Sequence, residues 1–363
     1  MKFCKSCVLP ETRPNLYLNS NGLCNACETF TKNSKINWTK REKLFVNLIN
    51  KFKSNNNYDC IIPVSGGKDS TWQVHTILKY GLKPLAITWK TPARTKIGQK
   101  NLDNLINLGV DHIDIQVNPE VESKFMLETL IRSGSTAIPM HFAIFNLPIA
   151  FASKFNIPLI IYGENSAKEY GGKKNEINKY FIDNNWLKKY GVNNSTQVKD
   201  WYSEILTKKE LNIYNLMNNK NPNKNIKSIF MGHFFRWDIE NSFKVAKKIG
   251  FKESSKSNIG YYNHTDIDCD FIPIHHWLKW YKFGFTRLMD NLSIEIRNNR
   301  ISRKEAIKIV HRSKDIIPER SIKKFCKYVK ITEKKFYSIA ETHRNLNIWS
   351  KKNGRWIING FIS

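Results

Sequence analysis

Short apolar runs alternate with longer amphipathic segments between residues 59 and 162. The runs are rich in Ile, Leu and Val, which is typical of strands covered on both faces. The longer segments repeat apolar residues at helical spacing. This alternation predicts an α/β fold, a parallel sheet with helices on both faces. We expect strands at 60–64, 85–89, 112–117 and 158–162, and helices at 69–80, 98–108, 121–132 and 140–155.

The alternating region divides the chain into three parts. Residues 1–45 hold four of the seven cysteines and are predicted to form a small zinc-ribbon-like module. Residues 46–265 hold the sheet, with an insertion around 167–227 that is rich in Lys, Asn, Trp and Tyr. We expect this insertion to cover the active site as a partly mobile lid, with surface decoration as the alternative. Residues 266–363 are predicted to be mainly helical.

The C-terminal region carries several helix-start signals. Ser302 and Glu305 have the spacing of a capping box, and Pro318 and Thr332 each stand where a helix can begin. Short helices are therefore predicted at 302–312, 318–329 and 332–343. They superficially resemble a helix-turn-helix, but none carries an evident set of base-reading residues, so a packing module is favoured.

Two cysteine pairs lie near the N-terminus. Two residues separate Cys4 from Cys7 and Cys24 from Cys27, and sixteen residues lie between the pairs. This is the spacing of a four-thiolate zinc site. Two disulfides are the alternative, and a reducing cytosol disfavours them. Four thiolates leave no open position for a substrate, so the expected role of Zn²⁺ is structural.

The formal net charge of the chain is +28 at pH 7. Such a charge suits a nucleic acid, an anionic membrane surface or a phosphorylated small molecule, and it also follows from a composition biased to Lys and Asn. Because the charge is spread along the chain without one dense block, we do not expect a nucleic-acid partner.

No segment has the features of a membrane or export signal. The N-terminal sequence MKFCKSC lacks the apolar core of a signal peptide. The most apolar stretch, 141–162, is interrupted by Asn146, Ser153, Lys154 and Asn156, so it fits a helix followed by a buried strand. We therefore expect a cytoplasmic protein without membrane insertion.

The stretch IIPVSGGKDST at 61–71 leads from a predicted strand through a glycine pair into a helix. Gly66 and Gly67 permit close approach to the backbone, and the amides that follow can point at an anion. Lys68 adds a cation. Asp69 is unusual beside phosphates, and it fits either a helix cap or a Mg²⁺ ligand. The pattern is not a Walker loop, which ends in Gly-Lys-Ser/Thr.

SGGKDS after a strand resembles the PP-loop of the ATP pyrophosphatase family, which has a HUP-like nucleotide-binding fold. The resemblance implies cleavage of ATP between the α- and β-phosphates, with pyrophosphate held in this loop. It also implies that backbone near Ala86 to Trp89 recognises adenine. We assign Lys68 and Asp69 to catalysis, with Glu164 beside Asp69 for Mg²⁺ or loop organisation. The predicted ATP site comprises Val64, Ser65, Gly66, Gly67, Lys68, Asp69, Ser70, Ala86, Thr88, Gly163 and Glu164.

Two enzyme branches and one binding class compete at this point. Enzymes that thiolate tRNA resemble one another in carrying a cysteine pair after the PP-loop, and here no Cys occurs between Cys60 and Cys269. That absence argues against thiolation, which remains the alternative. A nucleic-acid-binding protein with a degenerate loop is the third class. Amidation is the branch that the remaining sequence favours.

Four further stretches bear on amidation: IIYGENSAKEYGG at 160–172, MGHFFRWDIE at 231–240, DCDFIPIHHWLKWYKFGFTRLMD at 268–290 and IEIRNNRISRKEAI at 294–307. Together with SGGKDS and the cysteine pairs, they resemble the N-acetyl sugar amidotransferase family over nearly the whole chain. Members convert the acetamido group of a nucleotide-activated sugar into an acetamidino group, for bacterial surface polysaccharide or flagellar glycan. Adenylation of the amide oxygen would make it a leaving group for ammonia to displace.

The site for the sugar nucleotide is assigned to polar side chains in these stretches. Adjacent residues point in different directions on a helix or a strand, so at most one of His275 and His276 is expected to face the substrate. The candidates are Asn165, Lys168, His233, Arg236, His275 and His276.

The source of ammonia is the last question. One glutaminase class uses an N-terminal Cys, but Met-Lys-Phe precedes Cys4, and no nucleophile-elbow Cys with a downstream His is visible. The chain length also leaves no room for such a domain. The family resemblance implies a separate glutaminase subunit that delivers ammonia through a channel.

Overall fold

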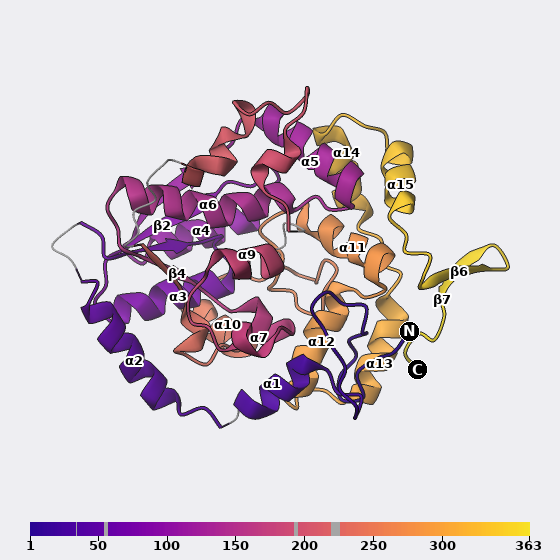
Figure 1. Ribbon diagram of the computed structural model, residues 1–363, viewed down its shortest axis with the longest axis horizontal. Coiled ribbons are helices and arrows are strands. Elements are labelled where there is room, and N and C mark those ends of the chain that lie inside the picture. The colour runs from indigo at the N-terminus through magenta and orange to yellow at the C-terminus, as the bar shows by residue number, and fades with distance from the viewer. Residues whose placement is uncertain (34, 54–56, 192–194, 219–225) are drawn as a thin grey trace.

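The computed structural model describes residues 1–363 except 34, 54–56, 192–194 and 219–225. A parallel sheet lies at its centre, with the strand order β3-β2-β1-β4-β5 (Figure 1). The strands are β1 (Cys60–Pro63), β2 (Pro84–Trp89), β3 (Asp111–Ile115), β4 (Leu159–Tyr162) and β5 (Lys227–Phe230). The predicted sheet is confirmed, with β5 as an additional edge strand. The strand order reverses between β1 and β4, which is where open α/β sheets bind ligands.

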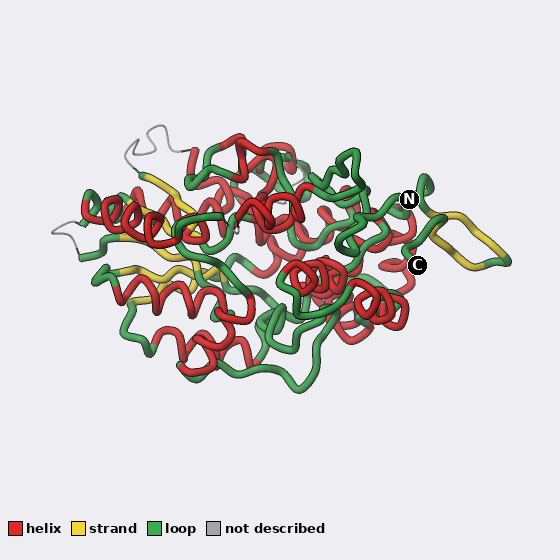
Figure 2. The backbone as a smooth tube through the Cα atoms, turned by 90° about the horizontal axis from the view of Figure 1, so that it is seen from below, coloured by secondary structure: helices red, strands yellow, loops and turns green. Residues whose placement is uncertain are grey.

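Helices cover both faces of the sheet (Figure 2). Cys60 and Ile62 of β1 enter one core, whereas Ile61 enters another, because successive side chains of a strand point to opposite faces. The first core is covered by α2 (Trp38–Asn50), α3 (Lys68–Lys79), α4 (Lys96–Ile106) and α10 (Ile239–Lys248). The second is covered by α6 (Ile138–Lys154), which follows α5 (Pro119–Ser133).

The apolar stretch at 141–162 forms most of α6 and all of β4, as predicted. Pro148 inside α6 has no N–H, so the carbonyl of Ile144 loses its helical partner. The hydroxyl of Tyr162 donates to that carbonyl over 3.3 Å. None of the described helices combines the length and the apolar character needed to cross a bilayer.

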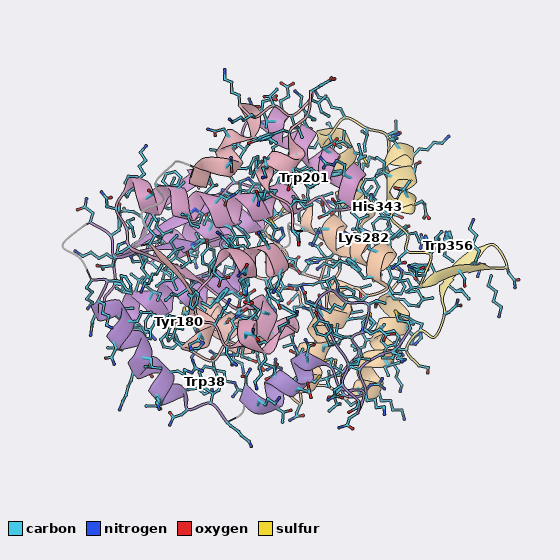
Figure 3. All side chains as sticks on the ribbon, in the orientation of Figure 1. Trp38, Tyr180, Trp201, Lys282, His343 and Trp356 are labelled. Atoms are coloured by element: carbon cyan, nitrogen blue, oxygen red, sulfur yellow. The ribbon has the colours of Figure 1, made fainter. Side chains whose placement is uncertain are left out.

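The described part of the insertion forms short helical segments that pack on the rest of the protein. Its elements are α7 (Ser166–Tyr170), α8 (Lys174–Ile177), α9 (Asn184–Tyr190) and the 3₁₀ segments η1 (Val198–Trp201) and η2 (Glu210–Asn218). Trp201 and Tyr214 are buried, with ring centroids 5.7 and 5.2 Å from that of Phe125 in α5 (Figure 3). Trp186 packs on Phe230 at 4.8 Å. The described part of the insertion is therefore anchored in the core by its aromatic rings, and its role as a lid over the active site stays a prediction.

The C-terminal region is mainly helical, as predicted. It contains α11 (Ile272–Phe283), α12 (Arg287–Arg297), α13 (Arg303–Ser313), α14 (Glu319–Tyr328) and α15 (Glu333–Thr342). The capping box of Ser302 and Glu305 is present. A hairpin of β6 (Trp349–Lys352) and β7 (Arg355–Ile358) protrudes from the body (Figure 1) and differs from the prediction. Its turn residues Asn353 and Gly354 both have positive φ, as a tight hairpin turn requires.

The N-terminal module packs on the C-terminal helices. Its buried side chains, including those of α1 (Asn25–Asn33), share a core with Leu292 of α12 and Val310 of α13. The predicted boundary at residue 45 falls inside α2, whose Phe45 is part of the sheet core. The two ends of the chain lie close together in Figures 1 and 2.

Candidate active site

The loop between β1 and α3 has the backbone of an anion site. Gly66 has a φ of +80°, and a Cβ there would lie 2.6 Å from the backbone N of Leu102 in α4. Only glycine fits such a position. Gly67 caps α3 without a side-chain hydrogen bond, so the first amides of the helix stay available to a ligand. Ser65 Oγ accepts from the N–H of Gly67 over 3.3 Å, and Ser70 Oγ donates to its carbonyl over 3.0 Å.

Lys68 and Asp69 are joined to each other and to the C-terminal half of the chain. The Nζ of Lys68 lies 2.5 Å from Oδ2 of Asp69, and Nε1 of Trp237 donates to Oδ1 over 3.1 Å. Lys68 is buried. Both oxygens of Asp69 are therefore engaged away from the helix amides. Of the two predicted roles of Asp69, the helix cap is not observed.

Glu164 stands across the switch point from the loop, directly after β4. Burial raises the pKa of Glu164, and the nearby charge of Asp69 raises it further. The two carboxylates are thus close enough to repel each other beside Lys68. Carboxylate pairs of this kind fit Mg²⁺, which prefers oxygen ligands and relieves the repulsion.

His264 approaches the loop from the C-terminal half, and the sequence prediction missed it. Burial lowers the pKa of His264 to about 4, and the charge of Lys68 contributes. Its ring stacks on Phe243 with a centroid distance of 3.9 Å. In the described part of the chain, Nε2 of His264 and the hydroxyl of Thr265 are buried without a hydrogen-bond partner. Such groups beside a loop suited to anions fit a polar ligand.

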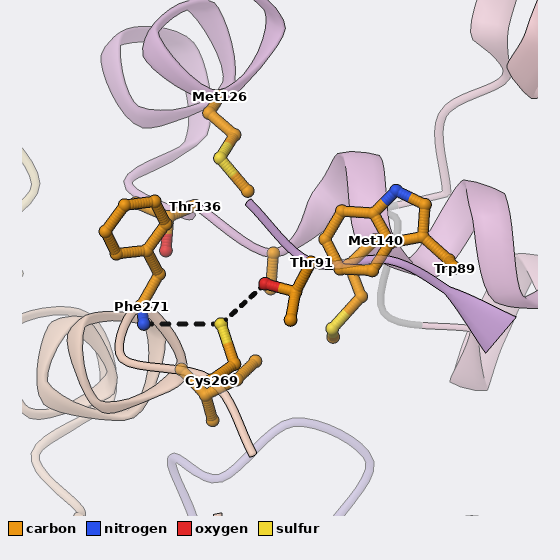
Figure 4. Close-up of a pocket in the computed structure, with 9 residues that line it drawn as sticks. Trp89, Thr91, Met126, Thr136, Met140, Cys269 and Phe271 are labelled. Carbon is orange, nitrogen blue, oxygen red and sulfur yellow. Dashed lines mark hydrogen bonds between the residues drawn. The ribbon is translucent and has the colours of Figure 1, made fainter. Parts of the chain in front are cut away.

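A small pocket lies at the end of β2 (Figure 4). Its wall is mostly apolar, and the Thr91 hydroxyl lies 2.8 Å from the Sγ of Cys269. The lining residues are Trp89, Thr91, Met126, Thr136, Ala137, Met140, Cys269, Phe271 and Ile272. The family resemblance puts adenine at this end of β2.

Two of the predicted ATP residues have structural roles in β2. Ala86 pairs with Ile62 of β1 and His112 of β3, so the sheet uses its backbone. The hydroxyl of Thr88 donates to the carbonyl of Val64 over 2.8 Å. The assignment of Ala86 to ligand contact is wrong, because this residue lies in the middle of the strand rather than at its end.

A second polar group surrounds α11 and the start of α12. We call it the α11 cluster; it comprises Arg13, His141, Asp266, His275, His276, Lys279, Lys282, Arg287 and Asp290. Arg287 Nε lies 2.9 Å from Oδ2 of Asp266, and His276 Nε2 lies 3.5 Å from Oδ1 of the same carboxylate. The other ring nitrogen of His276 contacts Nζ of Lys279 over 3.1 Å.

The two predicted histidines both belong to the α11 cluster. Ser135 Oγ lies 3.2 Å from Nδ1 of His275, whereas His276 faces Asp266. The neighbours therefore point in different directions, as expected. Burial lowers the pKa of both rings, that of His276 to about 4, so both are neutral at pH 7. The positive charge of Arg287 also lowers the pKa of Glu164, against the larger effect of burial, which raises it.

Asn165 holds the insertion in place. Its Oδ1 accepts from the N–H of Ala167 over 3.0 Å and from Nε1 of Trp186 over 3.1 Å. Its Nδ2 donates to the carbonyl of Glu176 over 3.1 Å. These bonds anchor α7, α8 and α9 immediately after the switch point.

The other predicted substrate residues lie apart from the α11 cluster. Lys168 donates to the carbonyl of Gly232 over 3.1 Å. His233 packs on Tyr180 with a centroid distance of 5.5 Å. Burial, together with the charges of Arg41 and Lys168, lowers the pKa of His233 to about 3. Arg236 is exposed. The structure thus brings Lys168 and His233 together, but with different neighbours from those of the two histidines on α11.

The four N-terminal cysteines converge as predicted. Their Sγ atoms all lie within 4.8 Å of one another, and no disulfide joins them. Cys7 and Cys24 are 3.8 Å apart, and Cys4 and Cys27 are 4.0 Å apart. These distances match the edges of a sulfur tetrahedron around Zn²⁺, in which each Zn–S bond is about 2.3 Å. The group could therefore hold zinc.

The sheet order and the loop agree with the resemblance noted in the sequence. A parallel sheet of order β3-β2-β1-β4-β5 has SGGKDS at its switch point, as expected for a fold similar to that of the PP-loop ATP pyrophosphatases. Residues 245–360 match the family model described as LPS biosynthesis protein WbpG-like, C-terminal domain. The matched region is the C-terminal third of the chain, and it contains His264 and most of the α11 cluster.

Other comparisons give distant matches. No curated protein matches the sequence. An NH3-dependent NAD synthetase from Campylobacter jejuni, in complex with the nitrate ion, is 20% identical; the match covers 38% of this chain and 62% of that one, with a TM-score of 0.30. An NMN synthetase from Francisella tularensis is 14% identical, with 78% of this chain and 98% of that one covered and a TM-score of 0.33.

Proposed function

We propose that the chain is an ATP-dependent, AMP-forming amidotransferase, which converts the acetamido group of a nucleotide-activated sugar into an acetamidino group. The observation that carries this proposal is the contact between the WbpG-like region and the PP-loop half. His264 lies close enough to Lys68 for the ammonium charge to act on its pKa. Cys269 forms a backbone bridge to Arg94 in the loop after β2. The region that matches a glycan-biosynthesis family thus packs against a loop suited to pyrophosphate. This arrangement supports a reaction in which ATP activates a glycan precursor.

The proposed reaction has two steps. The amide oxygen attacks the α-phosphorus of ATP, the bond to the bridging oxygen of the β-phosphate breaks, and pyrophosphate leaves. Ammonia then attacks the amide carbon, the C–O bond to AMP breaks, and proton loss leaves the amidine. The amides at the start of α3 and the ammonium of Lys68 stabilise the charge on pyrophosphate. Asp69 and Glu164 would hold Mg²⁺, which neutralises phosphate charge when bound.

We propose that a separate glutaminase subunit supplies the ammonia. A glutaminase needs a reactive thiolate. Burial raises the pKa of Cys269 to about 12 and that of Cys326 to about 11, and it also raises the pKa of Cys60. These cysteines are therefore held as inert thiols. The purified chain should use free ammonium weakly and need its partner for glutamine. Full activity of the purified chain with glutamine alone would contradict this proposal.

The test combines ATP, Mg²⁺ and ammonium chloride with a panel of nucleotide-linked N-acetyl sugars. We expect AMP and pyrophosphate to form only with a suitable sugar, and mass spectrometry to detect exchange of one oxygen for NH on that sugar. Lys68→Met and Asp69→Asn should abolish AMP formation in folded protein. AMP formation that requires tRNA instead would support thiolation, and normal AMP formation in both variants would refute the loop assignment.

A further inference from the structure

The α11 cluster contains more fixed positive than negative charge. Arg13 pairs with Asp290 over 2.8 Å, and Arg287 pairs with Asp266 over 2.9 Å. These two pairs use both carboxylates of the cluster. Lys279 and Lys282 remain, and each projects from the same helix as the two histidines.

Neither lysine forms an ion pair in the described part of the chain. Lys279 Nζ contacts His276 Nδ1 over 3.1 Å, and Lys282 Nζ donates to the carbonyl of Ser133 over 3.1 Å. Burial lowers the pKa of each lysine to about 8, although the charge of Asp290 opposes this change at Lys279. A buried ammonium without a counter-ion is costly, and a bound anion removes that cost.

The cluster also contains three imidazole rings, which carry no negative charge that would repel a bound anion. The rings of His141 and His275 have centroids 6.1 Å apart, and those of His275 and His276 are 5.4 Å apart. Burial lowers the pKa of His141 to about 4, so this row is neutral at pH 7. Neutral imidazoles offer an N–H donor without a negative charge.

The side chains of this group are mostly covered. Among the polar side chains, Arg13 is 13% exposed, His276 10% and Arg287 18%. Lys282 lies on α11 (Figure 3), and like Lys279 it is half-buried. A small phosphate ester can approach cations covered to this extent more readily than a polymer can. Two cations without ion pairs match the charge of a diphosphate diester.

The position of the cluster relative to the PP-loop suggests how such an ester would lie. Arg13 of the cluster donates to the carbonyl of Tyr170 over 3.0 Å, and Tyr170 ends the short helix α7 that begins two residues after Glu164. Arg287 contacts Asp266, which contacts His276. The cluster is therefore a neighbour of the ATP site with its own cations.

We propose that the α11 cluster binds the diphosphate of the sugar nucleotide, so that the attached sugar extends toward the PP-loop. The proposal rests on the proposed function for the identity of the ligand. Lys279 and Lys282 would be the main diphosphate contacts, with Arg287 next to the sugar. These are binding residues, and the chemistry of adenylation stays with the PP-loop.

The experiment measures binding of UDP and GDP to the full chain by calorimetry. Saturating Mg²⁺ and α,β-methylene-ATP, which cannot release pyrophosphate, keep the PP-loop occupied. Lys279→Met should weaken binding of the recognised nucleoside diphosphate about tenfold or more, as expected for the loss of a charged hydrogen bond. Lys279→Arg should retain binding within a few-fold. Lys323→Met removes an exposed lysine of α14 and should change nothing.

The outcomes separate this proposal from the proposed function. Equal binding by wild type and Lys279→Met, or no binding of either diphosphate by wild type, would overturn the site. Equal weakening of α,β-methylene-ATP in the folded variant would also overturn it, because the cations would then serve ATP. Lys279-dependent binding of UDP or GDP supports the site, even if no N-acetyl sugar gives AMP. In that case the amidotransferase proposal would be refuted, and the nucleoside diphosphate site on the α11 cluster would stand.

Discussion

Gly66→Ala should damage the fold of the PP-loop, and the adjacent glycine provides a matched control. A left-handed backbone costs a residue with a Cβ about 1–2 kcal/mol. The new Cβ would also lie 2.6 Å from the backbone N and 2.7 Å from the Cα of Leu102. Because these are backbone atoms of α4, the helix must shift, at a further cost of about 1–3 kcal/mol. The expected loss of stability is thus about 2–5 kcal/mol.

Gly67→Ala should behave differently. Gly67 has a φ of −68°, which any residue can adopt, and its Cβ would meet only the Ser65 hydroxyl at 3.2 Å. A hydroxyl can turn away, so the expected loss of stability is about 1 kcal/mol or less. AMP formation should still fall, because a methyl group would stand beside the amides that face the phosphates.

The assay is urea unfolding of wild type and both variants in one buffer, with AMP formation measured on the folded proteins. We expect a large fall of the unfolding midpoint for Gly66→Ala and a small one for Gly67→Ala. Equal midpoints for the two variants would refute the geometry assigned to the loop. A wild-type rate of AMP formation in Gly67→Ala would refute the role of the loop amides.

Three further predictions concern the core, the loop and the metal site. Burial raises the pKa of Glu122 from 4.5 to about 8, so the folded chain keeps a proton that the unfolded chain releases. The free energy of unfolding should therefore fall as pH rises from 4.5 to 8, by up to about 1.4 kcal/mol per pH unit. Glu122→Gln should reduce this pH dependence, which is measured from urea unfolding midpoints at several pH values. Trp237→Phe removes the donor to Asp69, and AMP formation should drop about tenfold in protein that is still folded, although the smaller ring also lowers the unfolding midpoint because Trp237 belongs to the sheet core; an unchanged rate would contradict the contact. Elemental analysis should find one zinc per chain. Cys7→Ser should lose this zinc and unfold at a lower urea concentration, whereas Cys326→Ser should keep it. Zinc retained in Cys7→Ser would exclude the four-thiolate site.

The parts of the fold that local pattern decides were predictable from the sequence. Strands β1 to β4, their helices and the capping box at Ser302 follow from periodicity and helix signals. The loop was predictable because SGGKDS is contiguous, and so were the two cysteine pairs. The β6–β7 hairpin had a signal in Asn353-Gly354 that the prediction did not use.

The remaining features depend on contacts between distant segments. Trp237 donates a hydrogen bond to Asp69, although 168 positions separate them in the sequence, and no local sequence pattern predicts this pair. Lys279 and Lys282 stand in an aromatic stretch and look like solvated charges, whereas the packing leaves both half-buried with lowered pKa values. The insertion is polar on average, whereas three of its aromatic side chains carry its packing, those of Trp186, Trp201 and Tyr214.

Arg13 links the metal module to the α11 cluster. It lies between the two cysteine pairs, and its side chain pairs with Asp290 of α12 and donates to the carbonyl of Tyr170 over 3.0 Å. Arg303 of α13 donates to the carbonyl of Cys7 over 3.1 Å, which fixes the module on the same helices. The cysteine cluster therefore positions a cation that neutralises Asp290, and this leaves the charge of Lys279 free for a ligand. Loss of zinc should weaken the binding of the nucleoside diphosphate more than that of α,β-methylene-ATP, because the PP-loop is held by β1, α3 and α4 instead.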